Sequence, residues 1–461
     1  MMISKINTYY FIGIGGIGMS ALARFFLLNG KRISGYDKNH SDITNTLKNE
    51  GAEIVFDESI LAIPEHLLQI EKESIAIIYT PAIPLDHPQL VYFTQNNFRI
   101  FKRSEMLGEI TKNNKCLAVA GTHGKTTVST LLSHLLNQTS NSCSAFLGGI
   151  SKNYKTNFLH SNKSQRMVVE ADEFDRSFLT LNPSLSIITS IDADHLDIYG
   201  NKESIKESFN LFANKLYENG ILIYKEGLEL KLNEKIKKFT YSIKSELADF
   251  HIKDLRVIDG FYKFSLVSPE KTINNLVLGL PGRFNLENAV AASAAAIISE
   301  ISESELRLGL ATFKGVVRRF DFQLRNEKIV FIDDYAHHPE EIKACLNSVK
   351  ELFPNKKITA VFQPHLFTRT RDFANEFSSA LSIANETILL PIYPAREKPI
   401  EGINSELLLK NITCKEKQIC EMTELVNILQ NKNIEIIITM GAGDIDKLVK
   451  PIKEMLEKKY E

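Results

Sequence analysis

A glycine-rich loop with a lysine, AGTHGKTT from Ala120 to Thr127, constrains the fold of this chain more than any other segment. It follows the apolar run KCLAVAG and precedes VSTLLSHLL, whose apolar residues have helical spacing. Gly121 and Gly124 free the backbone to wrap phosphate oxygens, and Lys125 supplies a positive charge. The sequence therefore predicts a strand, a phosphate-binding loop and a helix in succession, although Val119 occupies the position of the first glycine in the usual pattern.

A second glycine-rich loop lies near the N-terminus, in FIGIGGIGMSALA. Gly13, Gly15 and Gly18 have the G-x-G-x-x-G spacing between a strand-like and a helix-like run, and Asp37 closes the next strand-like run. This context is typical of dinucleotide binding and, taken alone, favours a nicotinamide dehydrogenase. Backbone N–H groups at a helix N-terminus attract any diphosphate, so a nucleotide sugar fits the loop equally well.

Strand-like and helix-like segments alternate along most of the chain. For 461 residues, roughly 150 residues per domain gives about three domains. We predict an α/β fold with a Rossmann-like N-terminal domain (1–104), a central P-loop ATPase-like domain with a mostly parallel sheet (105–316) and a Rossmann-like C-terminal domain (317–461). Ligands of open α/β sheets gather at the carboxyl ends of the strands, so polar residues there are the candidates for chemistry.

Two acidic segments follow apolar runs of the central domain. Glu170 ends MVVE, where a carboxylate can hold Mg²⁺ against phosphates on the lysine loop; a solvated acidic turn is the alternative interpretation of EADEFD. His195 follows LSIITSI, and imidazole matches Mg²⁺ poorly, so Asp192, Asp194 and Asp197 are alternatives as ligands. The strand-end argument therefore predicts a metal site at Glu170 and leaves the second segment open.

Further polar residues lie around the junction with the third domain. Asn285 and Asn288 begin the alanine-rich helix-like run, where amides commonly cap. Arg318 and Arg319, in FKGVVRRFD, are placed to bring a guanidinium onto a transferring phosphoryl group when domains close, with a surface ion pair as the alternative.

Several motifs, taken together, resemble those of the Mur ligases and their folylpolyglutamate synthetase relatives along the whole chain. They are GTHGKTT, VVEADEFDRSF, SIDADHLDIYG, PGRFNLENAVAA, FKGVVRRFD, IDDYAHHPEEI and FQPHLFTRTRDF. The resemblance implies an ADP-forming ligase that makes an amide bond through an acyl phosphate, with ATP and Mg²⁺ as cofactors. Paired with FIGIGGIGMSALA, it further implies UDP-N-acetylmuramate and L-alanine as substrates, in peptidoglycan synthesis.

The residue patterns and the resemblance together assign residues to each ligand. For ATP they are Gly121, Thr122, His123, Gly124, Lys125, Thr126, Thr127, Asn285, Asn288, Arg319 and Asp334. For the UDP sugar they are Gly13, Gly15, Gly16, Gly18 and Asp37; for the metal ions, Thr126, Glu170 and His195; for the amino acid, His365 and Arg369. The expected catalytic residues are Lys125, Glu170, His195, His338 and Arg319.

Three positions leave the assignment open. Spacing does not decide whether His337 or His338 faces the site. Phe284 stands where the family motif has a histidine beside the ATP base, and Leu366 stands where many relatives have an arginine after the histidine of FQPH. We therefore expect Arg369 to bind the carboxylate of the amino acid, with Arg371 as a second candidate.

Three other functions compete with this interpretation. A dehydrogenase leaves GTHGKTT without a role. A sibling Mur ligase, adding another amino acid or a recycled peptide, shares every phosphate motif. A non-catalytic nucleotide sensor has no need of Lys125, Glu170 and His195 together.

Composition narrows the expected partners and compartment. A net charge of −1 argues against a broad nucleic-acid surface. The five cysteines have no C-x-x-C spacing, which predicts neither a zinc site nor a disulfide framework and fits a reducing cytoplasm. No apolar run is long enough for a membrane span, and no export signal is recognised. We expect a cytoplasmic monomer or weak homodimer.

Overall fold

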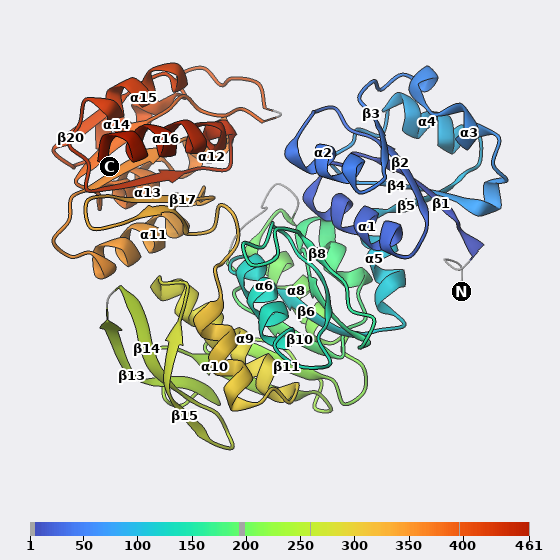
Figure 1. Cartoon of the computed structure of the whole chain (residues 1–461), viewed down its shortest axis with the longest axis horizontal. Coiled ribbons are helices and arrows are strands. Elements are labelled where there is room, and N and C mark those ends of the chain that lie inside the picture. Colours follow the sequence, from blue (N-terminus) through green and yellow to red (C-terminus); the bar gives the residue numbers. More distant parts are fainter. Residues whose placement is uncertain (1–4, 193–198, 259, 396, 461) are drawn as a thin grey trace. The chain divides into compact units, whose positions relative to one another are not determined.

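The computed structural model describes residues 5–192, 199–258, 260–395 and 397–460. Its strands form three sheets, of five, ten and six strands, with helices around them (Figure 1). The predicted α/β fold is confirmed. Residue contacts divide the chain into two compact units. The first holds the chain up to Leu255 with Phe264–Val277 and Glu287–Lys314, and the second holds Arg256–Lys263, Leu278–Leu286 and the chain from Gly315 onward.

The first sheet has the strand order β3-β2-β1-β4-β5, and its neighbours pair in parallel. Its strands are β1 (Thr8–Ile12), β2 (Arg32–Tyr36), β3 (Glu53–Val55), β4 (Ile75–Tyr79) and β5 (Arg99–Lys102). Its helices are α1 (Ile17–Leu28), α2 (Asp42–Asn49), α3 (Glu65–Leu68), α4 (Pro88–Gln95) and α5 (Arg103–Thr111), with 3₁₀ turns η2 (Ile60–Ala62) and η3 (Lys72–Ser74). Every residue of β1 is buried, as expected for a central parallel strand.

The second sheet has the order β15-β14-β13-β12-β11-β10-β6-β9-β7-β8. Its strands are β6 (Lys115–Ala120), β7 (Ser144–Phe146), β8 (Phe158–Leu159), β9 (Arg166–Glu170), β10 (Leu185–Ile188), β11 (Ile221–Lys225), β12 (Lys237–Ser242), β13 (Phe250–Ile258), β14 (Phe261–Val267) and β15 (Thr272–Leu278). Its helices are α6 (Lys125–Leu136), η4 (Phe174–Thr180), α8 (Lys202–Ala213), α9 (Arg283–Ile298) and α10 (Glu303–Thr312). The pairs β6–β9 and β6–β10 are parallel, so their carboxyl ends share one edge.

The third sheet has the order β16-β17-β21-β18-β19-β20, parallel except for the antiparallel edge strand β16. Its strands are β16 (Asp321–Arg325), β17 (Val330–Asp334), β18 (Ile358–Phe362), β19 (Glu386–Leu389), β20 (Glu416–Ile419) and β21 (Ile436–Met440). Its helices are α11 (Pro339–Leu352), α12 (Phe367–Asp372), α13 (Ala374–Leu381), α14 (Ser405–Asn411), α15 (Met422–Gln430), η5 (Asp444–Leu448) and α16 (Val449–Tyr460).

Within the first unit, α1 connects the first sheet to the second. Phe25 packs on Phe146 and Phe158 with ring centroids 5.6 and 5.9 Å apart. The buried Asn157 side chain donates to the carbonyl of Ile17 at 2.6 Å, in the first turn of α1. This helix follows the N-terminal glycine loop, so the contact fixes that loop relative to the second sheet.

The expected domain boundaries remain a proposal. Residue 104 lies inside α5, and residue 316 directly follows Gly315, where the second unit resumes. In the described ranges, no helix combines the length and the apolar character needed to cross a bilayer.

Candidate active site

The lysine loop joins the end of β6 to the start of α6, as predicted. Gly121 and Gly124 have φ of +137° and +83°, a region that L side chains rarely adopt. A Cβ at Gly121 would lie 2.0 Å from Thr189 Oγ1, and one at Gly124 would lie 2.5 Å from Asn288 Oδ1. The loop therefore requires both glycines, and Asn288 of α9 lies against it.

Hydroxyl groups after β10 fix the shape of the loop. The Thr122 and Ser190 hydroxyls are 2.8 Å apart, and Ser190 Oγ accepts the N–H of His123 at 2.9 Å. Asp192 donates its N–H to Thr122 Oγ1 at 3.1 Å, and its carboxylate lies 3.6 Å from the His123 ring. Ser190 was not predicted from the sequence, although it is the first residue of SIDADH, the segment that carries the predicted His195. His195, Asp194 and Asp197 lie outside the described residues.

The Lys125 ammonium is held from two sides. It donates to the carbonyl of Gly121 at 2.6 Å and to Glu173 Oε1 at 2.8 Å. Burial acts to lower the lysine pKa, but the charges of Glu173, Asp172 and Glu170 outweigh it and raise the pKa above its usual value. Lys125 is therefore a cation throughout the physiological range. The sequence did not identify Glu173, which is one of several acids in EADEFD.

The predicted metal residues Thr126 and Glu170 meet beside the loop. Thr126 Oγ1 donates to Glu170 Oε1 at 3.1 Å, and the N–H of Gly148 donates to Glu170 Oε2 at 3.0 Å. A hydroxyl and a carboxylate at the start of the loop helix are hard oxygen ligands of the kind that Mg²⁺ takes next to nucleotide phosphates. The residues present therefore fit a magnesium ion. A cluster of three or more His, Cys, Asp or Glu side chains suited to a metal does not occur in the described residues.

The N-terminal glycine loop has the predicted place between β1 and α1. Gly13 has φ of +88°, and Gly16 directly precedes the helix. The Asp37 carboxylate accepts the N–H of Gly15 at 2.7 Å and that of Asn39 at 3.0 Å. The loop and Asp37 thus form one structure at the carboxyl edge of the first sheet.

In the second unit, Arg318 and Arg319 have different surroundings. Arg318 donates to the carbonyl of Gly441 at 2.6 Å and pairs with Asp333 at 3.4 Å, so its guanidinium joins two strand ends. Both guanidinium groups also lie over the Tyr335 ring, that of Arg318 at 5.2 Å and that of Arg319 at 4.8 Å from its centre. Arg318 thus has a carbonyl and a carboxylate partner within its own unit, and the choice of Arg319 as the arginine that reaches ATP remains a prediction.

Asp334 is deeply buried at the end of β17. Its carboxylate accepts the N–H groups of Phe320 at 2.6 Å and of Ala336 at 2.7 Å. Burial nevertheless raises the pKa of Asp334 to about 7, against the opposing charge of Arg319. Asn285, predicted to contact ATP, belongs to the same unit and donates its side-chain amide to the carbonyl of Pro281 at 2.9 Å.

The predicted amino-acid residues cluster with one of the two adjacent histidines. The rings of His337 and His365 are 6.1 Å apart, and His365 stacks on Tyr393 with ring centres 5.7 Å apart. His338 instead contacts Phe373, with ring centres 5.0 Å apart. The geometry therefore favours His337 as the histidine beside this cluster, and the catalytic role given to His338 remains a prediction.

The positive charge in the cluster around His365 comes from Arg369. Burial, with the nearby His337 and Arg369, lowers the pKa of His365 to about 4, so its imidazole is neutral near pH 7. Arg371 is half exposed and pairs with Asp372 at 2.7 Å. A carboxylate clamp here would thus rest on the charge of Arg369, with His365 contributing a hydrogen bond.

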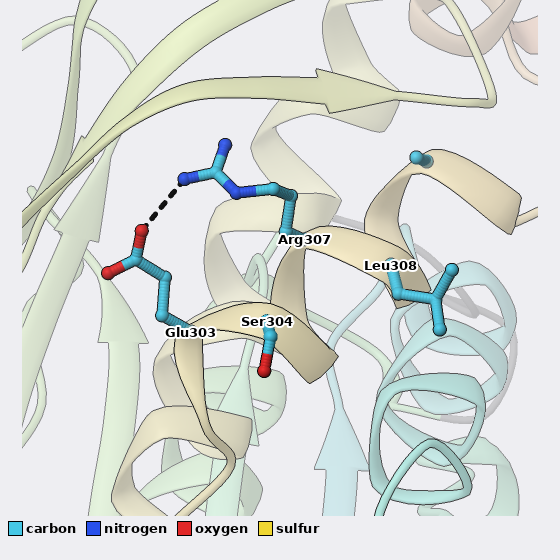
Figure 2. A pocket seen from close by; sticks show the side chains of 5 residues that line it. Glu303, Ser304, Arg307 and Leu308 are labelled. Atoms are coloured by element: carbon cyan, nitrogen blue, oxygen red, sulfur yellow. Dashed lines mark hydrogen bonds and ion pairs between the residues drawn. The ribbon is translucent and has the colours of Figure 1, made fainter.

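The predicted residues fall into two groups. The first unit brings together both glycine loops, Asp37, Glu170 and Asn288, and it buries Thr127 in the first turn of α6. The second unit holds Asn285, Arg319, Asp334, His337, His338, His365 and Arg369. A shallow hollow on α10, lined by Glu303, Ser304, Arg307, Leu308 and Ala311, contains none of them (Figure 2).

The fold and the phosphate loop define a nucleotide-binding α/β enzyme built on three sheets. Models of the Mur ligase family match three consecutive segments: the family's catalytic domain at residues 8–115, its middle domain at 119–296 and its glutamate ligase domain at 318–443. The chain belongs to the Mur ligase family.

Individual relatives agree along the full length. The UDP-N-acetylmuramate–L-alanine ligase of Parabacteroides distasonis is 48% identical over 99% of this chain and 98% of its own. That of Phocaeicola vulgatus is 49% identical over 100% of both chains. The crystal structure of the UDP-N-acetylmuramate-alanine ligase of Thermotoga maritima matches 98% of this chain and 99% of its own, with a TM-score of 0.83 and 26% identity. A murein peptide ligase from Psychrobacter arcticus, with a TM-score of 0.69 and 19% identity over 97% of this chain and 98% of its own, has the same fold.

Proposed function

We propose that this enzyme joins the lactyl carboxylate of UDP-N-acetylmuramate to the amino group of L-alanine and converts ATP to ADP and phosphate. The names and full-length similarity of the relatives support the substrates. The observation that carries the chemistry is the grouping of Lys125, Thr126 and Glu170 at one end of the phosphate loop. A cytoplasmic location follows from the proposed pathway, because ATP and UDP sugars are cytoplasmic metabolites.

The proposal assigns a group of residues to each ligand. The N–H groups of the loop from Gly13 to Gly18 bind the diphosphate of the UDP sugar, at the N-terminus of α1. The loop from Gly121 to Thr127 binds the ATP phosphates in the same unit. Arg319 and Asp334, which we propose for ATP, and Arg369 with His365, which we propose for the amino acid, belong to the second unit.

The first chemical step activates the carboxylate. One carboxylate oxygen attacks the γ-phosphorus of ATP, the bond from phosphorus to the bridging oxygen breaks, and ADP leaves with that electron pair. Two anions must approach one another, and the permanent charge of Lys125 lowers the cost of this approach. Mg²⁺ held by Thr126 and Glu170 would neutralise phosphate charge at the same place.

The second step forms the amide. The neutral amine of L-alanine attacks the acyl carbon, and the tetrahedral intermediate collapses with loss of phosphate and of one amine proton to solvent. The acyl phosphate is also open to attack by water, so the enzyme must hold the amine close and exclude solvent. Arg369 fixes the alanine carboxylate, and the neutral His365 orients it through a hydrogen bond.

Phosphate release from ATP tests the proposal. With UDP-N-acetylmuramate present, we expect release to depend on L-alanine and not on a tripeptide, and mass spectrometry should find the amide product. A tripeptide-dependent product would instead identify a sibling ligase, and turnover of NAD(H) would identify a dehydrogenase. Lys125→Ala should abolish the product while UDP-sugar binding persists, because Lys125 belongs to the ATP loop. Loss of both functions in a folded variant would contradict this division.

A further inference from the structure

Arg103 lies against the first turn of α1, which follows the N-terminal glycine loop, and against the acidic segment after β9. It begins α5, directly after β5 ends at Lys102. The strand order β1-β4-β5 is parallel, so Arg103 and the loop after β1 lie on the same carboxyl edge of the first sheet. Its guanidinium is thus placed where this sheet binds its ligand.

The glycine loop leaves room for this guanidinium. Gly18 lies in the first turn of α1, and a Cβ there would be 3.0 Å from both Cδ and Nη1 of Arg103. The third glycine of such a loop commonly serves close packing of helix on strand. Here it also allows an arginine from α5 to approach the helix N-terminus.

On its other side, Arg103 contacts the acidic segment after β9. Its Nη2 lies 3.3 Å from Oδ2 of Asp172, two residues after Glu170. Arg103 and Glu170 also line one small hollow, together with Ser104, Asp172 and Ser177. The guanidinium side chain is 18% exposed and that of Asp172 is 41% exposed. An ion pair of this length and exposure is weak and can exchange for a better carboxylate ligand.

We propose that Arg103 binds the lactyl carboxylate of the UDP sugar and holds it beside the phosphoryl group to be transferred, which deepens and rests on the function proposed above. The diphosphate binds at the Gly13–Gly18 loop, whereas the carboxylate must reach the ATP loop near Glu170. Arg103 borders both places. This carboxylate enters a region that contains Glu170, Asp172 and Glu173, and Lys125 is already paired with Glu173. A guanidinium, which can hold a carboxylate through two parallel hydrogen bonds, offsets that repulsion.

Binding measurements with the full-length enzyme test the assignment. We expect Arg103→Ala to weaken the binding of UDP-N-acetylmuramate by about ten- to a hundredfold, which is the loss typical of a charged hydrogen-bonded contact. The affinity for ATP should stay unchanged. UDP-N-acetylglucosamine, which lacks the lactyl carboxylate, should bind the variant and the wild type alike. Arg103→Lys should lose less affinity for UDP-N-acetylmuramate than Arg103→Ala, because lysine keeps the positive charge. Asp172→Asn is the matched control: it breaks the ion pair but keeps the guanidinium, so it should bind UDP-N-acetylmuramate as well as the wild type or more tightly.

Each other outcome overturns the assignment. If Arg103→Ala lost the same affinity for both UDP sugars, Arg103 would contact the diphosphate that they share and not the lactyl carboxylate. If Arg103→Ala and Asp172→Asn lost the same affinity for UDP-N-acetylmuramate, the Arg103–Asp172 ion pair would have only a structural role. If Arg103→Ala lost no affinity, Arg103 would not contact this ligand. If UDP-N-acetylglucosamine fails to bind the wild type, the comparison of Arg103→Ala with Asp172→Asn decides. Failure of the proposed function is distinguishable, because the wild type would then not bind UDP-N-acetylmuramate.

Discussion

Replacement of Gly148 by alanine should disable phosphoryl transfer through a single displaced carboxylate. Gly148 follows β7, and its backbone is outside the left-handed region, so alanine itself is tolerated there. A Cβ would lie 2.2 Å from Glu170 Oε2 and 2.4 Å from its Cδ and Oε1. Ordinary contact begins at 3.4 Å, so the Glu170 carboxylate must move by 3.4 − 2.2 = 1.2 Å. That movement breaks its hydrogen bonds with Gly148 N and Thr126 Oγ1.

The size of the effect follows from the displacement. A misplacement of about 1 Å in the positioning of a reaction can cost about a hundredfold in rate. We therefore expect kcat for phosphate release to fall about a hundredfold in Gly148→Ala, with the Kd of the UDP sugar unchanged. Steady-state phosphate release at saturating substrates measures the first quantity, and calorimetric titration the second.

Two variants serve as controls for this prediction. Gly309→Ala also adds a methyl group inside the first unit, but its Cβ would meet the flexible end of Leu135 at 2.7 Å, far along α6 from the loop. It should keep near-wild-type kcat. In Gly148→Ala/Glu170→Asp, the shorter acid relieves the clash, so the double variant should be more active than the product of the two single effects predicts. Gly148→Ala with activity within about threefold of the wild type would refute the placement of Glu170 in phosphoryl transfer.

Two further predictions concern pH and amino-acid recognition. Burial lowers the pKa of His134 from 6.5 to about 4. Between these values the unfolded chain binds the proton and the folded one does not, so this group makes the free energy of unfolding fall as pH drops from 6.5 towards 4, by about 3 kcal/mol in all. Urea unfolding from pH 4.5 to 7.5 should therefore show a flatter profile in His134→Gln, and an unchanged slope would exclude His134 as the source. At position 366, where φ is +69°, arginine is no more strained than leucine. Leu366→Arg should lower the KM for L-alanine several-fold by adding a cation beside Arg369, while Leu366→Met should leave the KM unchanged. A raised KM in Leu366→Arg would show that the apolar side chain itself shapes this site.

The residues most clearly predicted from the sequence were those whose role follows from local backbone geometry. Gly121 and Gly124 were predicted from their spacing, and both have positive φ. Glu170 was predicted because it ends a strand, and β9 pairs in parallel with β6, which places Glu170 opposite Val119. A local rule suffices where neighbouring parallel strands end at the same edge.

The residues that the sequence missed depend on tertiary packing. Glu173 is one acid among several in EADEFD, and its selection by Lys125 follows from the path of the chain after β9. The choice of His337 over His338 depends on the approach of β18 and its following loop, which carry His365. The strands from β12 to β15, which extend the second sheet, arise from a region whose pattern was too irregular to predict.

The transfer of oxygen from the sugar carboxylate to phosphate tests the central claim most directly. UDP-N-acetylmuramate labelled with ¹⁸O in both lactyl carboxylate oxygens should yield inorganic phosphate with one ¹⁸O atom and an amide that retains the other, because the acyl phosphate bridges carbon and phosphorus through a substrate oxygen. Mass spectrometry of the released phosphate reads this out in a single turnover. Unlabelled phosphate, formed together with the amide, would contradict activation of the carboxylate by the ATP held at the lysine loop.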